Sequence, residues 1–318
     1  MHFRKPKFWD YKKPNLIAYL LFPITILITI NNFLLKIYPK KKFYKIKTIC
    51  VGNIYLGGTG KTPTTLKLYE LLKNLNLKIA TAKKDYSHQQ DEEMLLEKKS
   101  NFIKSKERSN IIAKAIENGI DLIIFDDGLQ EKRLDFDIKF VCFDCKSWIG
   151  NGLLIPSGPL REKIQSLTKH DAVFLKSSIK NFNTSEICSK IKKINPNIEI
   201  FNSYVIIKNI NQFNLSDKFI IFSGIGNASS FKDTLINNNF NITKEIIFTD
   251  HHEYKLKEIS KILNFAKKEK AEILTTEKDY IKIPENLKDK INCIEIDLEI
   301  KEQDKLINLI KTKINETN

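Results

Sequence analysis

A glycine-rich turn between a predicted strand and a predicted helix constrains the fold of this 318-residue chain more than any other feature. Residues 46–51 alternate and then become apolar, as a buried strand does, and leucines recur at helical spacing through Thr62–Leu75. The turn between them is Gly57-Gly58-Thr59-Gly60-Lys61-Thr62. Strand, glycine loop and helix in this order are typical of a phosphate-binding loop, which predicts an α/β fold.

The chemistry of this loop favours ATP and Mg²⁺ as ligands. Its glycines let backbone N–H groups point at an anion, and the helix N-terminus adds its dipole. Lys61 is expected to reach the β- and γ-phosphates, and the hydroxyl of Thr62 to hold Mg²⁺. The strict pattern G-x-x-x-x-G-K-[ST] has glycine where this chain has Tyr55, so a glycine turn without nucleotide stays an alternative.

An acidic strand end is a second feature that supports a nucleotide site. The apolar stretch 122–125 ends in Asp126-Asp127-Gly128. Such an ending alone is usually just a turn. Because phosphate-loop enzymes need a carboxylate at a strand end near the loop, we expect Asp126 and Asp127 to join Thr62 at the metal.

An uncharged segment, residues 16–30, precedes the loop and contains Pro23. Lysines and Arg4 flank it on both sides, so the charges do not orient it across a bilayer but suit anionic headgroups. We therefore expect residues 1–45 to be a membrane-anchoring helix with basic flanks against the cytoplasmic face of a membrane. A buried helix and a cleaved signal peptide are the alternatives.

The net charge of +15 comes from lysines dispersed along the chain, and no signature of DNA or RNA binding accompanies them. We expect an anionic membrane surface as a partner, no nucleic acid and no protein partner. The five cysteines are scattered, and Cys142 and Cys145 lie in or beside an apolar run, which favours buried thiols over a metal or redox pair.

Three classes of protein fit the loop and the acidic strand end. A partition-type switch ATPase at a membrane would carry lysine at position 56, where this chain has Leu56. A phosphoesterase is suggested by Asp250-His251-His252, but it would need further Asp and His ligands and no glycine loop. The third class is a small-molecule kinase.

The order of motifs resembles that of the tetraacyldisaccharide 4′-kinase family of lipid A biosynthesis. Beyond the two motifs above, the matching segments are Val51-Gly52-Asn53, Leu129-Gln130, Arg133-Leu134, Gly150-Asn151-Gly152, Pro156-Ser157-Gly158-Pro159-Leu160-Arg161-Glu162, Gly224-Ile225-Gly226-Asn227, Asp250-His251 and Thr276-Glu277-Lys278-Asp279. Together they cover nearly the whole chain. This chain departs from the family's R-G-Y at positions 84–86, from its G-D-E-P at positions 90–93, and from its proline at Ala228.

The resemblance implies transfer of the ATP γ-phosphate to the 4′-hydroxyl of a tetraacyl glucosamine disaccharide 1-phosphate. It also implies that Asp91 and His251 form the base. Helix-start roles for Asp250 and His251 are the alternative. Arg161 is implied as a phosphate clamp and Glu162 as a metal ligand, with a surface salt bridge as the alternative. Gln130 and Asn227 are implied to contact the nucleotide, while Glu277, Lys278 and Asp279 lie at a predicted strand end without assigned roles.

The alternation of strands and helices predicts a phosphate-loop domain at residues 46–210, with a doubly wound, mainly parallel sheet. A second, smaller α/β unit is expected at residues 211–318, with the boundary near residue 210. Since Asp91 and His251 fall in different units, the predicted site lies between the two.

Overall fold

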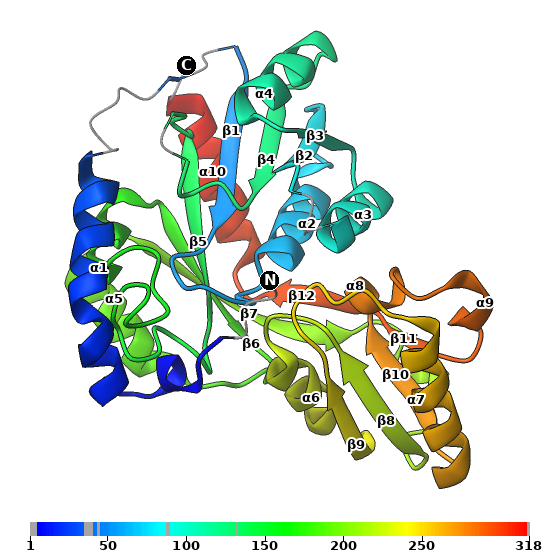
Figure 1. The fold of residues 1–318 in the computed structure, drawn as a ribbon. Coiled ribbons are helices and arrows are strands. Elements are labelled where there is room, and N and C mark those ends of the chain that lie inside the picture. Colours follow the sequence, from blue (N-terminus) through cyan, green and yellow to red (C-terminus); the bar gives the residue numbers. More distant parts are fainter. Residues whose placement is uncertain (1–4, 35–40, 43–44, 87–89, 132, 317–318) are drawn as a thin grey trace.

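A large, mainly parallel sheet forms the centre of the structure (Figure 1). The computed structural model describes residues 5–34, 41–42, 45–86, 90–131 and 133–316. The strand order in the eight-stranded sheet is β12-β7-β6-β5-β1-β4-β2-β3, and only the β12–β7 pair is antiparallel. These strands are β1 (Lys47–Gly52), β2 (Ile79–Lys84), β3 (Phe102–Ser105), β4 (Leu122–Asp126), β5 (Ile138–Asp144), β6 (Ala172–Ser177), β7 (Glu199–Ile207) and β12 (Ile296–Ile300).

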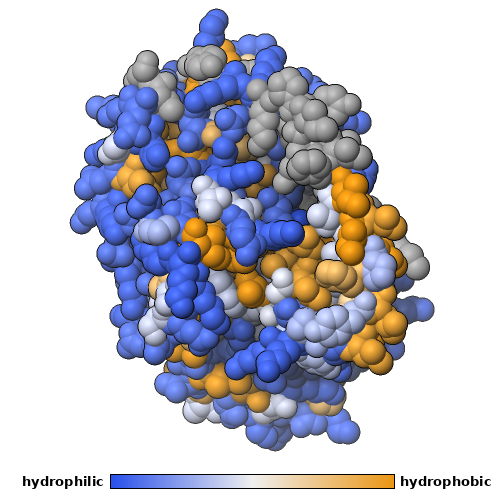
Figure 2. All heavy atoms as spheres, turned by 90° about the vertical axis from the view of Figure 1, so that its left-hand side faces the viewer, coloured by the Kyte–Doolittle hydropathy of each residue, from blue (hydrophilic) through white to orange (hydrophobic). Residues whose placement is uncertain are grey.

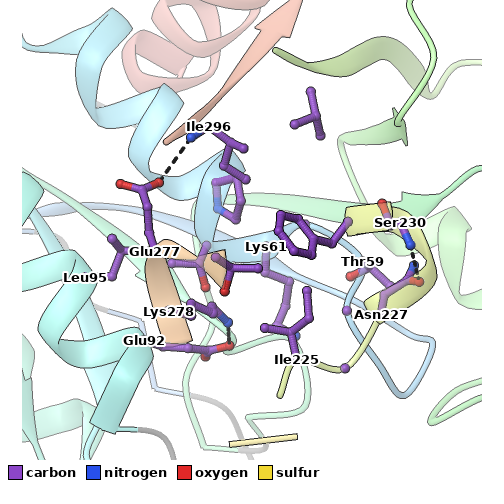
Figure 3. A pocket seen from close by; sticks show the side chains of 18 of the residues that line it. Thr59, Lys61, Glu92, Leu95, Ile225, Asn227, Ser230, Glu277, Lys278 and Ile296 are labelled. Atoms are coloured by element: carbon purple, nitrogen blue, oxygen red, sulfur yellow. Dashed lines mark hydrogen bonds and ion pairs between the residues drawn. The ribbon is translucent and has the colours of Figure 1, made fainter. Parts of the chain in front are cut away.

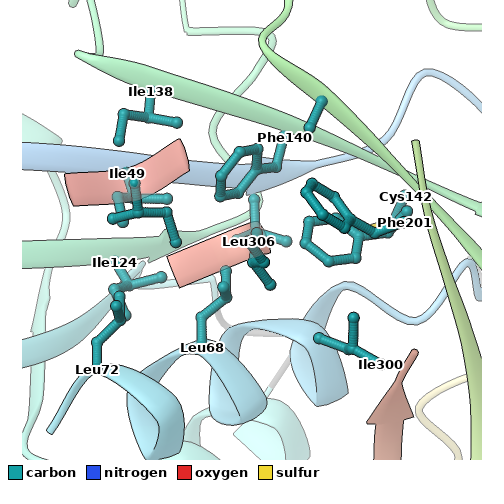
Figure 4. Close-up of a cluster of buried hydrophobic side chains, with 14 of the residues drawn as sticks. Ile49, Leu68, Leu72, Ile124, Ile138, Phe140, Cys142, Phe201, Ile300 and Leu306 are labelled. Carbon is teal, nitrogen blue, oxygen red and sulfur yellow. The ribbon is translucent and has the colours of Figure 1, made fainter. Parts of the chain in front are cut away.

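The central strands of this sheet carry apolar side chains on both of its faces. Helices therefore cover both faces. One face packs Ile49 and Phe140 against Leu68 and Leu306 (Figure 4). The helices beside this sheet are α2 (Lys61–Leu72), α3 (Gln90–Lys99), α4 (Arg108–Glu117), α5 (Ser185–Ile194) and α10 (Gln303–Glu316), with the short 3-10 turn η2 (Ile164–Lys169). The 3-10 turn η3 (Ile210–Gln212) packs through Ile210 against the core of the second sheet, described next. The predicted α/β fold with a parallel sheet is confirmed.

A second sheet of four parallel strands has the order β11-β10-β8-β9. Its elements are β8 (Lys218–Ser223), α6 (Ala228–Asn237), β9 (Asn241–Ile247), α7 (Leu256–Glu269), β10 (Glu272–Thr276), α8 (Glu277–Tyr280), α9 (Glu285–Lys288) and β11 (Asn292–Ile294). The chain then returns to the large sheet, where β12 pairs with β7 and α10 contributes Leu306 and Ile310 to the core. The division into units at residue 210 stays a prediction.

The N-terminal segment begins with the 3-10 turn η1 (Lys7–Asp10) and continues as helix α1 (Leu16–Leu34). The predicted helix is present, but a membrane-crossing helix is not found: none within the described residues is long and apolar enough to cross a membrane. Instead, α1 lies along the outside of the domain and contacts it through a narrow stripe that includes the buried Ala18 and Thr25. The Thr25 hydroxyl lies 2.7 Å from the Ser157 hydroxyl.

The turn η1 attaches this segment to the loop that carries Arg161. Trp9 is buried, and its indole N–H donates to the Pro156 carbonyl at 3.0 Å. The Trp9 carbonyl accepts from Asn151 N–H at 2.9 Å, and a Cβ at Gly150 would lie only 2.1 Å from that carbonyl oxygen. Glycine is therefore required at position 150 for η1 to dock.

Candidate active site

The glycine loop connects β1 to α2 and is braced from its own strand. The Asn53 amide donates to the Gly57 carbonyl at 3.2 Å and to the Thr59 hydroxyl at 3.1 Å. Gly60 has φ 89°, and a Cβ there would lie 2.6 Å from the Lys176 side chain. Only glycine fits this left-handed, crowded position at the start of a helix. The glycine loop thus lies between a strand and a helix, as the sequence predicts.

Tyr55, the departure from the strict loop pattern, is a buried structural contact. Its hydroxyl lies 2.7 Å from the Asp10 carboxylate and accepts from Lys5 Nζ at 3.1 Å. Its ring covers Gly57, where a Cβ would lie 3.2 Å from the ring. The N-terminal segment therefore touches the phosphate loop itself.

The predicted metal ligands Thr62 and Asp126 meet at the end of β4. The Thr62 hydroxyl donates to Asp126 Oδ2 at 2.9 Å, whereas Asp126 Oδ1 is buried and has no hydrogen-bond partner. Asp127 lies 3.7 Å from Lys61 Nζ. Burial would raise the pKa of Asp127, but the charges of Lys61 and Arg161 hold it below its ordinary value.

Arg161 and Glu162 join this cluster through Gln130. Arg161 donates to Asp127 Oδ1 at 3.3 Å and to the Gln130 side-chain oxygen at 3.1 Å. The amide of Gln130 donates to the Asn53 carbonyl at 2.8 Å and to Glu162 at 3.3 Å. Arg161 lines the cavity described below, so the structure places it in the site and not in an outer-surface salt bridge.

Asp91 and His251, which are 160 residues apart in the sequence, meet at 2.7 Å between Oδ1 and Nδ1. Burial would lower the pKa of His251, but the hydrogen bond with Asp91 and the charge of Asp250 raise it. Conversely, burial would raise the pKa of Asp91, but His251 and Lys278 lower it. Asp91 is buried, whereas His251 reaches the cavity.

The helix-start alternative for Asp250 and His251 does not hold, because α7 begins at Leu256 and its N-cap is Lys255. His252 instead lies 3.1 Å from Glu258 and stacks on Phe248. It is a neighbour of the site.

Two motifs of the second sheet brace the site from the opposite side. A Cβ at Gly226 would lie 3.1 Å from Gly58 N, so the two glycine-containing loops touch. The side chain of Asn227, predicted to contact the nucleotide, accepts from Ser230 N–H and caps α6 (Figure 3). Asp279 is fully buried and accepts from Gly224 N–H at 3.1 Å and from the Tyr254 hydroxyl at 2.9 Å. These contacts make Asp279 a structural residue.

Sequence reasoning missed one buried cation and its partners. Lys83, at the end of β2, is fully buried and donates to Asp126 Oδ2 at 3.1 Å and to Glu92. Lys278 also pairs with Glu92, across the gap between the two sheets (Figure 3). Burial would lower the pKa of Lys83, but Asp126 and Glu92 raise it. A lysine at a strand end in a lysine-rich chain carries no distinctive signal.

A cavity of about 840 Å³ lies between the two sheets, lined by the phosphate loop and by some of the groups described above. Its floor is the phosphate loop, and its walls include Arg161, Glu92, Lys278 and His251. An apolar part is lined by Tyr69, Val205, Ile225, Phe231, Ile294 and Ile296. A cavity of this size, with convergent polar groups and an apolar section, is typical of a small-molecule site.

The sequence over residues 17–315 matches the family described as tetraacyldisaccharide-1-P 4′-kinase. The chain belongs to this kinase family. A tetraacyldisaccharide 4′-kinase from Pelagibacter ubique is 42% identical over 320 residues, covering 100% of both chains. One from Rickettsia conorii is 34% identical and covers 95% of this chain and 96% of its own.

Among solved structures, the LpxK protein of Aquifex aeolicus, described as an "apo" form in complex with ATP, has a TM-score of 0.68. It is 22% identical and covers 94% of this chain and 100% of its own, so it supports the fold. Membership of the tetraacyldisaccharide-1-P 4′-kinase family favours a kinase over the switch ATPase and the phosphoesterase. The roles of the individual site residues stay predictions.

Proposed function

We propose that this chain transfers the γ-phosphate of ATP to the 4′-hydroxyl of a tetraacyl disaccharide 1-phosphate. The observation that supports it most is the convergence of the phosphate loop and the Asp91–His251 pair on one cavity. A phosphate donor bound on the loop and a hydroxyl near His251 would share that cavity. Transfer then needs mainly positioning and charge neutralisation.

The end of the cavity beside the phosphate loop can supply both the positioning and the charge neutralisation. The loop residues and Lys61 line the cavity where the β- and γ-phosphates would bind, and Arg161 adds a second positive charge to its wall. The apolar section with Ile225, Phe231 and Ile296 suits the nucleotide base. Gln130 holds Arg161 in place through a hydrogen bond, whereas Asn227 lines the cavity and caps α6.

The residues present fit Mg²⁺ carried by the nucleotide. Asp126 Oδ1 is a buried acceptor without a partner beside the Thr62 hydroxyl, and Asp127 and Glu162 complete the candidate ligands. No cluster of three or more His, Cys, Asp or Glu in the described residues could hold a metal by itself. Since Mg²⁺ is usually held by one or two carboxylates plus substrate phosphates, this is the expected arrangement. The ion would neutralise charge on the phosphates.

The acceptor hydroxyl must lose its proton during transfer. His251 reaches the cavity, and Asp91 behind it fixes the ring and stabilises its charged form. The pair therefore accepts the proton as a unit, with Lys282 3.4 Å from Asp91 Oδ2 keeping that carboxylate ionised.

We further propose that α1 holds the enzyme on an anionic membrane surface, at the cytoplasmic face of an inner membrane. In α1, small side chains face the protein and large apolar side chains face outward, which is the reverse of the arrangement in an amphipathic helix of a soluble protein. Its inward stripe contains Ala18 and Thr25, while Leu16, Leu20 and Leu27 are 75%, 71% and 67% exposed. Figure 2, which views the side that carries α1, shows the apolar surface gathered there. Such a patch marks an interaction site, and a four-chain lipid substrate stays in the bilayer.

The decisive experiment for the kinase is a phosphotransfer assay with Mg-ATP, with and without the acylated disaccharide. We expect slow hydrolysis of ATP alone and stoichiometric phosphate transfer to the lipid. Bilayer-stimulated hydrolysis without any phosphorylated lipid would instead support a switch ATPase.

The membrane proposal is tested by vesicle flotation of Leu20→Glu and Leu27→Glu. We expect both to lose binding to anionic vesicles and to keep the fold, because these side chains contact no core. Ile236→Glu, the same apolar-to-acidic change at a half-exposed site on α6, is the control and should still float. Equal binding by all three variants would exclude α1 as the anchor.

A further inference from the structure

Lys83 is the one fully buried ammonium group beside the phosphate site among the residues that the structure describes, and the transfer scheme above does not use it. Its side chain has 0% exposure, and it does not line the cavity. It is therefore not exposed to a nucleotide or acceptor that would bind in the cavity. Any effect that it has on the reaction must act through its partners.

The position of Lys83 follows from strand register. Strands β2 and β4 are parallel neighbours, and Ala82 pairs with Phe125. One residue further along each strand, Lys83 and Asp126 come level at the carboxyl edge of the sheet. There, Nζ donates to Asp126 Oδ2 at 3.1 Å, on the same oxygen that accepts the Thr62 hydroxyl.

The other partner of Lys83 is Glu92, in the first turn of α3. Glu92 follows Asp91 directly, and Lys278 holds it from the second sheet. Lys83 is thus a link between the strand end that carries Asp126 and the helix turn that carries Asp91. Without it, the buried carboxylate of Asp126 and the half-buried carboxylate of Glu92 would lose their shared cation, which is a costly arrangement.

We propose that Lys83 is a positioning residue that serves as a built-in counter-ion for Asp126 and Glu92. It holds both carboxylates in place while the nucleotide is absent, and its charge opposes binding of a free divalent cation. Mg²⁺ consequently enters the site together with ATP, whose phosphates supply the missing negative charge. This inference rests on the proposed use of Mg-ATP, but it concerns a property of the nucleotide-free protein.

The test is a calorimetric titration of MgCl₂ into nucleotide-free protein, with thermal unfolding as a second measurement. We expect millimolar Mg²⁺ to leave the melting temperature of the wild-type protein unchanged. Lys83→Met should bind Mg²⁺ at least about tenfold more tightly, a change of about 1.4 kcal/mol. The variant should also melt at a lower temperature without Mg²⁺ and regain stability with it.

Lys104→Met is the matched control. Lys104 pairs at 3.0 Å with Glu93, on the same helix as Glu92, but it contacts neither Glu92 nor Asp126. Its removal should leave Mg²⁺ binding at the wild-type level. A folded Lys83→Met protein with wild-type Mg²⁺ affinity overturns the proposal, as does stabilisation of the nucleotide-free wild type by Mg²⁺ alone.

If Lys83→Met does not fold at any Mg²⁺ concentration, Glu92→Gln and the double variant with Lys83→Met answer the question. The double variant removes the cation together with one of its carboxylates. It should bind Mg²⁺ more tightly than Glu92→Gln alone, and equal affinities reject the counter-ion role. Because no measurement involves turnover, failure here is separate from failure of the kinase assay.

Discussion

Removal of Asp91, His251 or both is the sharpest test of the proposed chemistry. The two side chains meet at 2.7 Å, and the Asp91 side chain is only 2% exposed. Asp91 therefore acts on the acceptor through His251. If the pair is one base, either alanine substitution removes the whole contribution of general-base catalysis, about 10²- to 10⁴-fold in turnover. This equals about 2.7 to 5.4 kcal/mol of activation free energy.

The double variant distinguishes a unit from two independent groups. For a unit, the double substitution should cost little more than either single one, because the second residue has nothing left to support. For independent groups, the losses multiply to about 10⁴- to 10⁸-fold. The structure predicts the first result, since the imidazole of His251 is oriented by the Asp91 carboxylate.

The assay is steady-state phosphotransfer, with the KM for ATP measured in parallel. The KM for ATP should barely change, because neither residue belongs to the phosphate loop. Thr62→Ala and Asp126→Ala should weaken use of Mg-ATP directly. His252→Ala is the matched control and should retain turnover, as His252 contacts Glu258 outside the cavity.

Two results would refute this reasoning. Multiplicative losses would show that the residues act independently, even if both matter. Full activity of Asp91→Ala would show that the base lies elsewhere, and Asp85 or Glu92 would be tested next. Glu92 is the better placed of these two, because it lines the cavity.

Three further outcomes are expected. Lys61→Ala should nearly abolish transfer in a protein with unchanged circular dichroism, since the ammonium neutralises the transferred phosphate; near wild-type turnover would contradict the kinase. Tyr55→Phe should lower the free energy of unfolding by about 0.5 to 1.5 kcal/mol, because it removes the hydroxyl that meets Asp10, and urea unfolding measures this. His251 has a folded pKa above 6.5, so its stabilisation is complete below pH 6.5 and is lost as pH rises through the folded value. The stability difference between wild type and His251→Gln should therefore shrink as the pH rises above about 6.5; a constant difference would exclude the ionised pair.

Two kinds of feature could be predicted from the sequence: those formed by residues close together in the chain, and those implied by an order of motifs that resembles a known family. A strand, a glycine loop and a helix are consecutive in the chain, so the phosphate loop is readable from residues 46–75. The Asp126-Asp127-Gly128 ending is equally local. The pairing of Asp91 with His251 is not, because 160 residues separate them, and it followed only from the resemblance to a family.

Tertiary structure alone decided the rest, because these features depend on which distant segments come into register. Strand β12 joins the large sheet antiparallel to β7 although the segment before it belongs to the small sheet, and no local pattern marks that return. The stripe of α1 that faces the protein is recognisable only once Thr25 meets Ser157. Lys83 is an ordinary lysine in a chain with 53 Lys and Arg residues until parallel pairing places its ammonium beside Asp126 in a site without water-exposed surface.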